Sequence, residues 1–416
     1  MTIASIAAMA MMLLQEQATA QPPVVPSRGG LARESRGGRS PIQLLKGQLP
    51  TAGGRALHEI ELLGGRHELE HDERGKAFLV VTWYGGDEGL EHLTAISNLR
   101  WLDLSRTNVT DAGLEKIRGL DKLQVLKLQQ TRVSDAGLAS LSAMTALEGL
   151  ALHDTKTSAA GIENLAPLVN LKVLNLSWTK TGDAGLAMIS KLANLEELYL
   201  YDAKVTDKGV ASLARLSRLR ALKLSYNRIT DQSLASLKRL PNLEALWLEF
   251  TQVGDKGLVP LADFPALRGL FLSETQVSDE GLAQLARVRT LEALDLTNLP
   301  VTDRGLEGLS GCTQLKMLSL AGTDVTNAGM KSLAQLENLG QLNLSGTKID
   351  DAGLAPLAAL SQLTSLDVSQ TKVGNGLARH IRRWPQLMQL NLRGARISDA
   401  ALKELRESWA DLEIIR

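Results

Sequence analysis

The sequence predicts an α/β solenoid shaped as a horseshoe, with a parallel sheet on the concave side and short helices on the convex side. Leucine recurs at a spacing of 24 residues, thirteen times from Leu99 to Leu387. Within each unit an alternating Leu-x-Leu segment is typical of a strand with one buried face. A Thr-Asp-x-Gly-Leu step then leads into apolar residues three apart, which is typical of a short helix. Chance does not produce such a period.

The first half of each unit is the predicted strand. In the unit that starts at Leu99, Leu102 and Leu104 alternate with residues of other types. Because side chains alternate across a strand, we expect these leucines to point into the core and residues 101, 103 and 105 to face the concave solvent side. A threonine at the place of Thr107 recurs in most units. We expect this threonine to hydrogen-bond neighbouring backbone in a ladder.

The second half of each unit is the predicted helix. Thr110 is a good N-cap residue and Asp111 lies in the first turn, where both side chains can accept hydrogen bonds from free backbone N–H groups. Leu114, Ile117 and Leu120 then turn one apolar stripe inward. Calcium needs clustered oxygen ligands, whereas a whole coil separates adjacent aspartates of this kind. The aspartates are therefore interpreted as helix caps.

One unit of this kind cannot bury its own apolar face, so the units must stack. Parallel strands stack at about 4.8 Å and helices at about 8–10 Å, which makes the helical side convex. The units match L-x-x-L-x-L-x-x-N/C-x-L, with threonine mostly at the Asn/Cys position. In this pattern the chain resembles the leucine-rich repeat family over about residues 75–410.

The VTDAGL-type units narrow this resemblance. They are similar to those of exported bacterial leucine-rich repeat proteins and to the ribonuclease-inhibitor-like repeats of F-box substrate receptors. The resemblance implies a protein that binds other proteins. A ubiquitin-ligase substrate receptor is one alternative, but it would need an F-box-like helical module before the repeats, and residues 21–74 hold a predicted linker and hairpin instead.

Composition limits the function further. The chain of 416 residues has 46 basic and 46 acidic side chains, which argues against a strongly basic nucleic-acid binder. Its hydrophobic fraction of 44% and charged fraction of 22% exclude intrinsic disorder and a multi-span membrane protein. Cys312 is the only cysteine, so no internal disulfide and no cysteine-based zinc site can form. We expect no cofactor and no metal.

The sequence divides into five segments. Residues 1–20 are a predicted signal peptide, because the apolar run from Ile3 to Leu14 is too short to span a bilayer and a small-x-small cleavage pattern precedes Gln21. Residues 21–54 are a predicted disordered Pro/Gly/Arg linker. Residues 55–98 are the predicted N-terminal cap and first coil, with a helix from Ala56 to Leu63. Residues 99–404 are the repeats and 405–416 the C-terminal cap. The signal predicts export to the periplasm or the cell exterior.

A zinc-protease pattern occurs in the N-terminal cap. The segment from His67 to His71 reads HELEH and matches H-E-x-x-H, in which two helical histidines bind zinc beside a catalytic glutamate. Here Gly64-Gly65 precedes the segment and an Asp-Glu-Arg-Gly turn follows it, which leaves little room for a helix. In a strand the two histidines would lie about 13 Å apart, too far to chelate one ion. The segment is therefore predicted to be half of a hairpin.

The positions on the concave side vary while the scaffold stays constant, and five consecutive units gather aromatic residues there. Clustered exposed aromatics indicate a binding site. The acidic residues among them favour a basic or amphipathic protein or peptide over nucleic acid. We predict that Tyr199, Lys223, Trp247 and Phe271 form one open strip. The predicted ligand-binding site comprises Trp178, Glu197, Tyr199, Tyr201, Asp202, Tyr226, Trp247, Glu249, Phe250, Phe271 and Glu274.

Three alternatives compete with protein binding at this site. An aromatic stack between the repeats could simply stiffen the sheet. Carbohydrate is the second ligand class, because aromatic faces with flanking carboxylates suit sugar rings. Glu249 and Glu274 lie on adjacent coils, which raises glycoside hydrolysis as a third alternative. The sequence contains no Gly-rich phosphate loop and no Ser-centred nucleophile elbow, and we predict a protein without enzymatic activity.

Overall fold

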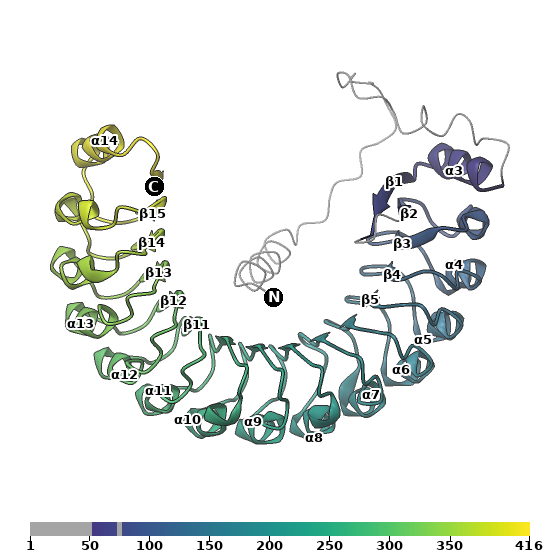
Figure 1. The fold of residues 1–416 in the computed structure, drawn as a ribbon, viewed down its shortest axis with the longest axis horizontal. Helices are drawn as coiled ribbons and strands as arrows, with labels where there is room; N and C mark the ends of the chain where they lie inside the picture. The colour runs from purple at the N-terminus through teal and green to yellow at the C-terminus, as the bar shows by residue number, and fades with distance from the viewer. Residues whose placement is uncertain (1–51, 73–76) are drawn as a thin grey trace.

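The computed structural model describes residues 52–72 and 77–416, which form one curved solenoid (Figure 1). Sixteen strands follow one another in chain order in a single sheet on the inner side, and the helices lie on the outer side. β1 and β2 pair antiparallel, whereas the repeats pair parallel, as β9 does with β10. The predicted α/β horseshoe is confirmed. The predicted signal peptide and the predicted linker up to residue 51 lie outside the described residues.

Most strands of the sheet span three residues. The strands are β1 (Arg66–His71), β2 (Ala77–Thr82), β3 (Leu99–Asp103), β4 (Val125–Lys127), β5 (Gly149–Ala151), β6 (Val173–Asn175), β7 (Glu197–Tyr199), β8 (Ala221–Lys223), β9 (Ala245–Trp247), β10 (Gly269–Phe271), β11 (Ala293–Asp295), β12 (Met317–Ser319), β13 (Gln341–Asn343), β14 (Ser365–Asp367), β15 (Gln389–Asn391) and β16 (Glu413–Ile415).

The outer side combines α-helices with short 3₁₀ helices. The α-helices are α3 (Ala52–Leu62), α4 (Asp111–Ile117), α5 (Asp135–Leu138), α6 (Ala159–Ile162), α7 (Gly182–Ile189), α8 (Asp207–Ser212), α9 (Asp231–Leu237), α10 (Asp255–Leu258), α11 (Asp279–Leu285), α12 (Asp303–Glu307), α13 (Met330–Leu333) and α14 (Asp399–Ser408). The 3₁₀ helices are η1 (Leu90–Ala95), η2 (Ala139–Leu141), η3 (Glu163–Leu165), η4 (Leu213–Arg215), η5 (Val259–Asp263), η6 (Asn327–Gly329), η7 (Asp351–Leu354), η8 (Pro356–Ala359), η9 (Asn375–Arg379) and η10 (Ile381–Arg383). Within the described residues, no helix is both long and apolar enough to cross a bilayer.

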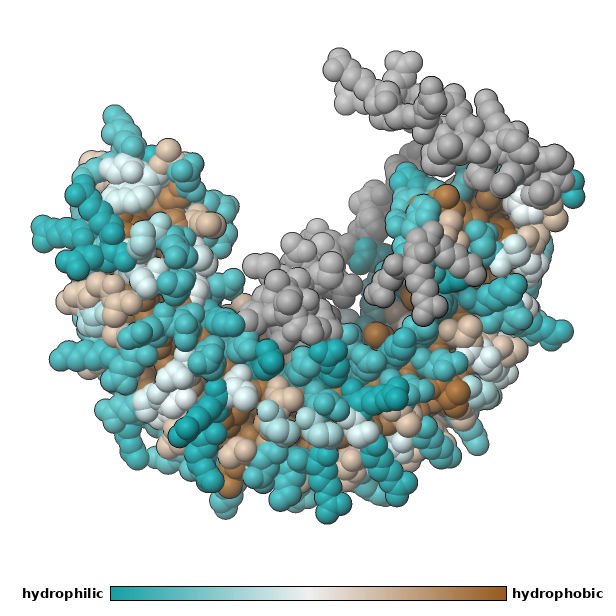
Figure 2. All heavy atoms as spheres, viewed as in Figure 1, coloured by the Kyte–Doolittle hydropathy of each residue, from teal (hydrophilic) through white to brown (hydrophobic). Residues whose placement is uncertain are grey.

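The leucines of the 24-residue period stack coil upon coil. Leu102 pairs with Leu126, and Leu126 with Leu150, in the parallel ladder of the sheet. Leu114 and Ile117 of α4 meet these strand leucines from the outer side, and all of them belong to one buried core that runs through the solenoid. Figure 2 shows hydrophilic side chains over the outer rim and hydrophobic atoms between the coils. Each coil is therefore stabilised mainly by its neighbours.

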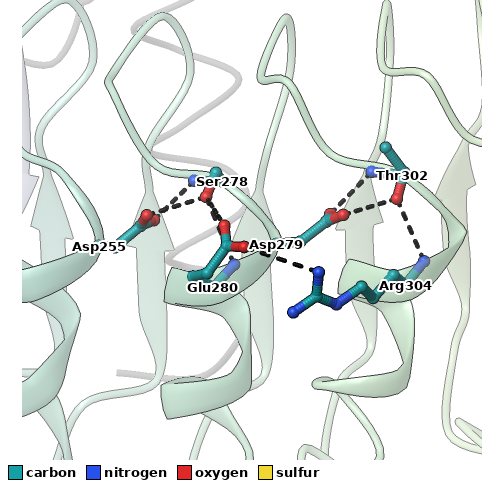
Figure 3. A network of polar contacts seen from close by, with 6 residues as sticks. All are labelled: Asp255, Ser278, Asp279, Glu280, Thr302 and Arg304. Atoms are coloured by element: carbon teal, nitrogen blue, oxygen red, sulfur yellow. Dashed lines mark hydrogen bonds and ion pairs between the residues drawn. The ribbon is translucent and has the colours of Figure 1, made fainter.

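The recurring aspartates bond to the next coil, which corrects their interpretation as caps of their own helices. Asp255 Oδ1 accepts the backbone N–H of Ser278 at 2.7 Å and its Oδ2 accepts the Ser278 hydroxyl at 2.8 Å. Asp279 receives the same pair of bonds from Thr302, at 2.8 and 2.6 Å (Figure 3). Ser278 and Thr302 in turn cap their own helices. We call this series of bonds the aspartate ladder.

The aspartate ladder explains the glycine of the Thr-Asp-x-Gly-Leu step. A Cβ atom added to Gly281 would lie 2.4 Å from Asp255 Oδ1, and one added to Gly137 would lie 2.4 Å from Asp111 Oδ1. Such a distance requires the carboxylate to move, because real Cβ atoms essentially never approach so closely. Glycine at this place lets the preceding coil's carboxylate approach.

The recurring threonines bond within their own coil, so they do not form the expected ladder. The Thr107 hydroxyl donates to the carbonyl oxygen of Leu104 at 2.7 Å, three residues back, and Thr131 does the same to Leu128 at 2.7 Å. A bond between coils occurs where asparagine replaces threonine. Asn227 Nδ2 donates to the Leu200 carbonyl oxygen of the preceding coil at 2.6 Å.

The N-terminal cap consists of α3 and the β1–β2 hairpin. α3 begins at Ala52 and ends at Leu62, so it starts before the predicted Ala56 and takes in residues assigned to the linker. The HELEH segment lies in β1 and pairs with β2, which confirms a strand and not a helix. Trp83 is buried beneath this cap and donates its indole N–H to the Gly86 carbonyl oxygen at 3.0 Å.

The C-terminal end is closed by α14 and β16, which begin and end at other residues than the predicted 405–416. α14 starts at Asp399, since the Ser398 hydroxyl caps it. Ile414 of β16 pairs with Leu390 of β15 and, together with Trp409, packs against the end of the leucine core.

Candidate functional site

The concave side carries two groups of aromatic side chains. The first group, here called the aromatic row, consists of Trp178, Tyr201, Tyr226 and Phe250. Neighbouring ring centroids lie 4.8 Å apart for Trp178–Tyr201, 4.7 Å for Tyr201–Tyr226 and 4.1 Å for Tyr226–Phe250. His153 continues the row beyond Trp178 at 6.3 Å. The rings form a continuous ribbon from coil to coil.

Backbone geometry places three of the four rings just after the ends of the strands, and Tyr201 lies one residue earlier in its coil. Trp178, Tyr226 and Phe250 have φ angles of 54°, 60° and 55°, in the left-handed region, and Asp202 and Glu274 have 48° and 56°. Non-glycine residues adopt this region rarely, so its recurrence shows that the turn of each coil requires it. The turn carries these side chains outward, and Trp178, Tyr226 and Phe250 are 44%, 43% and 45% exposed.

The second aromatic group lies on the strands themselves. Trp247 of β9 and Phe271 of β10 stack with ring centroids 5.1 Å apart and planes only 3° apart. Ala221 and Ala245 belong to the same small cluster, which is separate from the leucine core, and their short side chains let the indole lie against the sheet. Trp247 is 2% exposed, and Phe271 and Tyr199 are also buried. The expected open strip of Tyr199, Lys223, Trp247 and Phe271 is therefore wrong, and Lys223 is buried too.

The predicted carboxylates near the aromatic row have partners inside the chain. Glu197 accepts the Tyr199 hydroxyl at 2.8 Å, and Asp202 pairs with Lys204 at 2.5 Å. Of these two carboxylates, only the charge of Asp202 is offset by a cation, because the hydroxyl bonded to Glu197 is neutral.

Glu249 and Glu274 lie on neighbouring coils and are also engaged. Glu249 accepts the Ser225 hydroxyl, and Glu274 accepts a bond from Asn298 Nδ2 at 2.7 Å. Burial raises the pKa of the Glu249 carboxyl, although Lys223 and the Ser225 hydroxyl oppose this shift. Each of the two carboxylates therefore has a hydrogen-bond donor on a neighbouring coil.

A groove of about 700 Å³ follows the concave side from the aromatic row to the last strands. Tyr201, Tyr226 and Phe250 line one end of the groove. Asn343 and Asn391 line the other end, with further amide, hydroxyl and carboxyl side chains. The groove therefore has an aromatic half and a polar half.

The HELEH histidines are not arranged as metal ligands. His67 and His71 lie at opposite ends of β1, and His67 Nδ1 is 3.5 Å from Glu61 Oε1 of α3. Among the described residues, no group of three or more His, Cys, Asp or Glu side chains could hold a metal ion.

One set of exposed side chains beside the aromatic row was missed by the sequence reasoning. It lies two residues after the left-handed turn residue in five consecutive coils. We call it the basic column, and its members are Arg132, Lys156, Lys180, Lys204 and Arg228. All of these side chains are exposed. The 24-residue period contains the signal, because the column appears once the position after each strand turn is aligned.

The comparisons with known proteins agree with this architecture. A family described as "Leucine-rich repeat region" matches residues 134–302, and a second, described as "Leucine Rich repeat", matches residues 95–117 and 335–358. None of the curated proteins compared with the chain matches it.

Solved structures of leucine-rich repeat proteins resemble the fold. A Listeria monocytogenes internalin is 23% identical with a TM-score of 0.60, and the match covers 88% of this chain and 95% of the internalin. A Leptospira interrogans leucine-rich repeat protein is 20% identical with a TM-score of 0.52, covering 78% and 92%. The ectodomain of an Arabidopsis thaliana receptor kinase, solved in complex with Casparian strip integrity factor 2, is 19% identical with a TM-score of 0.52. That match covers 80% of this chain but only 43% of the ectodomain.

Proposed function

The chain belongs to the leucine-rich repeat family, and we propose that it binds another protein or a peptide, without catalysis, on the concave side of its horseshoe. The observation that carries this proposal is the exposed aromatic row. Nearly half of the surface of Trp178, Tyr226 and Phe250 is exposed to solvent. This exposure is notable because only 3% of all residues are aromatic. Large aromatic side chains dominate the binding energy of protein interfaces. The buried pair of Trp247 and Phe271 lines the same groove as Tyr201, Tyr226 and Phe250.

The arrangement of the rings favours a protein over a carbohydrate. Sugar rings bind to open aromatic faces, whereas the faces between Tyr201, Tyr226 and Phe250 are covered by one another. The ring edges are not covered by these contacts, and they suit side chains of a protein. The internal partners of Glu249 and Glu274 likewise argue against glycoside hydrolysis.

The predicted basic character of the partner rests on the carboxylates of the site. Glu197, Asp202, Glu249 and Glu274 all have partners within the chain. Only the Asp202 contact involves a cation, so the charge that the site offers to a partner depends on the basic side chains nearby as well as on these carboxylates.

Export is a further part of the proposal. It rests on the apolar run from Ile3 to Leu14 and on the small-x-small pattern before Gln21. N-terminal sequencing of the exported protein should begin at Gln21. A chain that keeps Met1 in the cytoplasm contradicts this part without touching the binding proposal.

Selection of ligands from a random peptide display library tests the binding proposal. Selected peptides should bind the chain in titration calorimetry and lose at least about tenfold in affinity, near 1.4 kcal/mol, on Tyr226→Gln with Phe250→Gln. Glutamine is a suitable replacement because Gln130 and Gln370 occupy the same left-handed position in other coils.

Gln370→Asn is the matched control, since it changes the same backbone position far from the aromatic row and should leave affinity unchanged. Circular dichroism should show that all variants stay folded. Selected peptides whose affinity ignores the aromatic variants would place the site elsewhere.

A further inference from the structure

The basic column runs parallel to the aromatic row at nearly the spacing of the strands. Backbone bridges join Ser134 to Lys156, Ser158 to Lys180 and Thr206 to Arg228, so the column keeps the pairing of the sheet. At about 4.8 Å per coil, the distance from Arg132 to Arg228 is roughly 19 Å. Lys204 reaches back to Asp202 at 2.5 Å, which shows that a side chain of the column can stand beside the row.

Most members of the basic column take part in no ion pair among the described residues. Among the residues described by the structure, Lys204 is the one member of the basic column with an ion pair. The carboxylates of the row itself are engaged by Lys204 or by neutral donors such as Asn298. Asp154, next to Trp178, accepts only a long bond of 3.3 Å from Gln130 Nε2. Four exposed cations without an ion pair in the described part of the chain therefore run beside the row, where the carboxylates already hold hydrogen bonds or, for Asp202, an ion pair.

The aromatic row adds to this preference. Tyr226 and Phe250 are stacked with planes 28° apart, so one face of each ring is covered by the other while the ring edges stay uncovered by this contact. Ring edges carry partial positive charge, while ring faces carry partial negative charge. Cations bind to faces, and oxygen atoms of carboxylates are better neighbours for edges.

We propose that the partner contributes an acidic, amphipathic segment that lies along the solenoid, with apolar side chains on the aromatic row and carboxylates on the basic column. This inference rests on the proposed function of the concave side. An extended segment rises about 3.3 Å per residue and points alternate side chains to opposite sides, so about six residues cover the column. Glutamate or aspartate alternating with leucine or valine meets both surfaces at once.

Nucleic acid and other polyanions fit this surface less well. Single-stranded nucleic acid needs open aromatic faces on which bases can stack. In the aromatic row the ring centroids are already 4.1–4.8 Å apart, which leaves no room for a base between them. A purely charged polymer would leave the aromatic row uncovered.

Fluorescence anisotropy with the full chain and synthetic peptides tests the inference. Peptides of about ten residues are long enough to span the column with residues to spare. One peptide alternates glutamate with leucine, a second alternates lysine with leucine, and a third alternates glutamate with serine. The Glu-Leu peptide should bind most tightly, and its affinity should fall as salt is raised, because exposed charge pairs are screened. Lys156→Gln, Lys180→Gln and Arg228→Gln together should weaken it about tenfold.

Lys348→Gln with Lys372→Gln is the matched control, because both lysines occupy the same place in coils at the other end of the solenoid. This control should leave the affinity for the Glu-Leu peptide unchanged. Tyr226→Gln with Phe250→Gln should weaken the Glu-Leu peptide and leave the weak Glu-Ser peptide unchanged.

Three results would overturn the inference. One is no binding of the Glu-Leu peptide. Another is tighter binding of the Lys-Leu peptide that still depends on Tyr226 and Phe250, which would leave the proposed function standing with the opposite charge. The third is binding of heparin that displaces the Glu-Leu peptide and depends on the basic column but not on the aromatic row.

Discussion

The aspartate ladder predicts that Gly281→Ala and Asp255→Ala disturb one and the same contact. An added Cβ at Gly281 would lie 2.4 Å from Asp255 Oδ1 and 3.1 Å from the Asp255 Cα atom. The carboxylate would therefore have to leave its position. In leaving, it would give up the Ser278 backbone N–H at 2.7 Å and the Ser278 hydroxyl at 2.8 Å.

The magnitudes follow from these contacts. Overpacking at Gly281 costs about 1–3 kcal/mol. Loss of the acceptor for the Ser278 N–H by Asp255→Ala costs about 1–3 kcal/mol as well. Because both variants remove the same bonds, the double variant should cost at least about 1 kcal/mol less than their sum. Gly281→Ser should be milder than Gly281→Ala, since Ser233 occupies the equivalent place and donates to Asp207 Oδ1 at 2.5 Å.

Hydrogen exchange measured by mass spectrometry is the appropriate assay. Long repeat arrays lose cooperativity, so the local opening free energy of the segment around Ser278 reports the effect better than one global transition. Exchange in distant coils, such as those before Leu195, should stay as in the unmodified chain. Strict additivity of Gly281→Ala and Asp255→Ala, within about 0.5 kcal/mol, would refute the reasoning that they share one contact.

Two further predictions concern residues outside the candidate site. Cys312 donates to the Leu285 carbonyl oxygen at 3.1 Å, and burial raises the pKa of its thiol to about 12. We expect Cys312 to react with Ellman's reagent at pH 8 only as fast as its coil opens, and rapid reaction of the folded chain would contradict its burial. For His67 and His71, we expect a chelator, or alanine at both places, to leave the circular dichroism and the melting transition unchanged. Stoichiometric zinc that is lost in the double alanine variant would show a metal site.

The sequence predicted the fold to the level of the register, because one period determines it. Leu102, Leu126 and Leu150 are spaced by 24 residues and pair with one another in the sheet. The aspartate ladder was not predicted, since capping rules concern one helix and its own first turn. The partner of Asp255 lies 23 residues later, on a different coil.

The candidate site was predicted less completely, for two physical reasons. Alternation along a strand says that Trp247 leaves the leucine core, but not that Ala221 and Ala245 make room for its ring to lie flat. The ring contacts of Tyr226 and Phe250 also depend on the left-handed turn after each strand, which a strand pattern does not describe. The basic column was missed because only positions on the strands and one neighbour were compared.

The aspartate ladder contains one coil in which the two partners have exchanged their chemistry. Asn327 occupies the aspartate position, and Asp350 occupies the Ser/Thr position. The Asp350 N–H donates to Asn327 Oδ1 at 3.0 Å, and Asn327 Nδ2 donates to Asp350 Oδ1 at 2.7 Å. The bond from Asn327 is the largest cause that lowers the pKa of the Asp350 carboxyl below its ordinary value of 3.8. The pair therefore keeps one carboxylate and one donor, as Asp303 and Thr326 do.

This exchange predicts a charge-dependent defect for Asn327→Asp. The substitution places a second carboxylate at the position of the 2.7 Å bond, so the pKa of the carboxylate pair should rise above 3.8. A raised pKa in the folded state means that stability falls as pH increases beyond the unfolded value, so the defect should be present at pH 7 and small at about pH 3. Asp350→Thr in the same chain rebuilds the pairing of Asp303 with Thr326 and should restore the urea midpoint at pH 7. An equal loss of stability at both pH values, or no rescue by Asp350→Thr, would mean that the two positions do not act as an exchanged donor and acceptor.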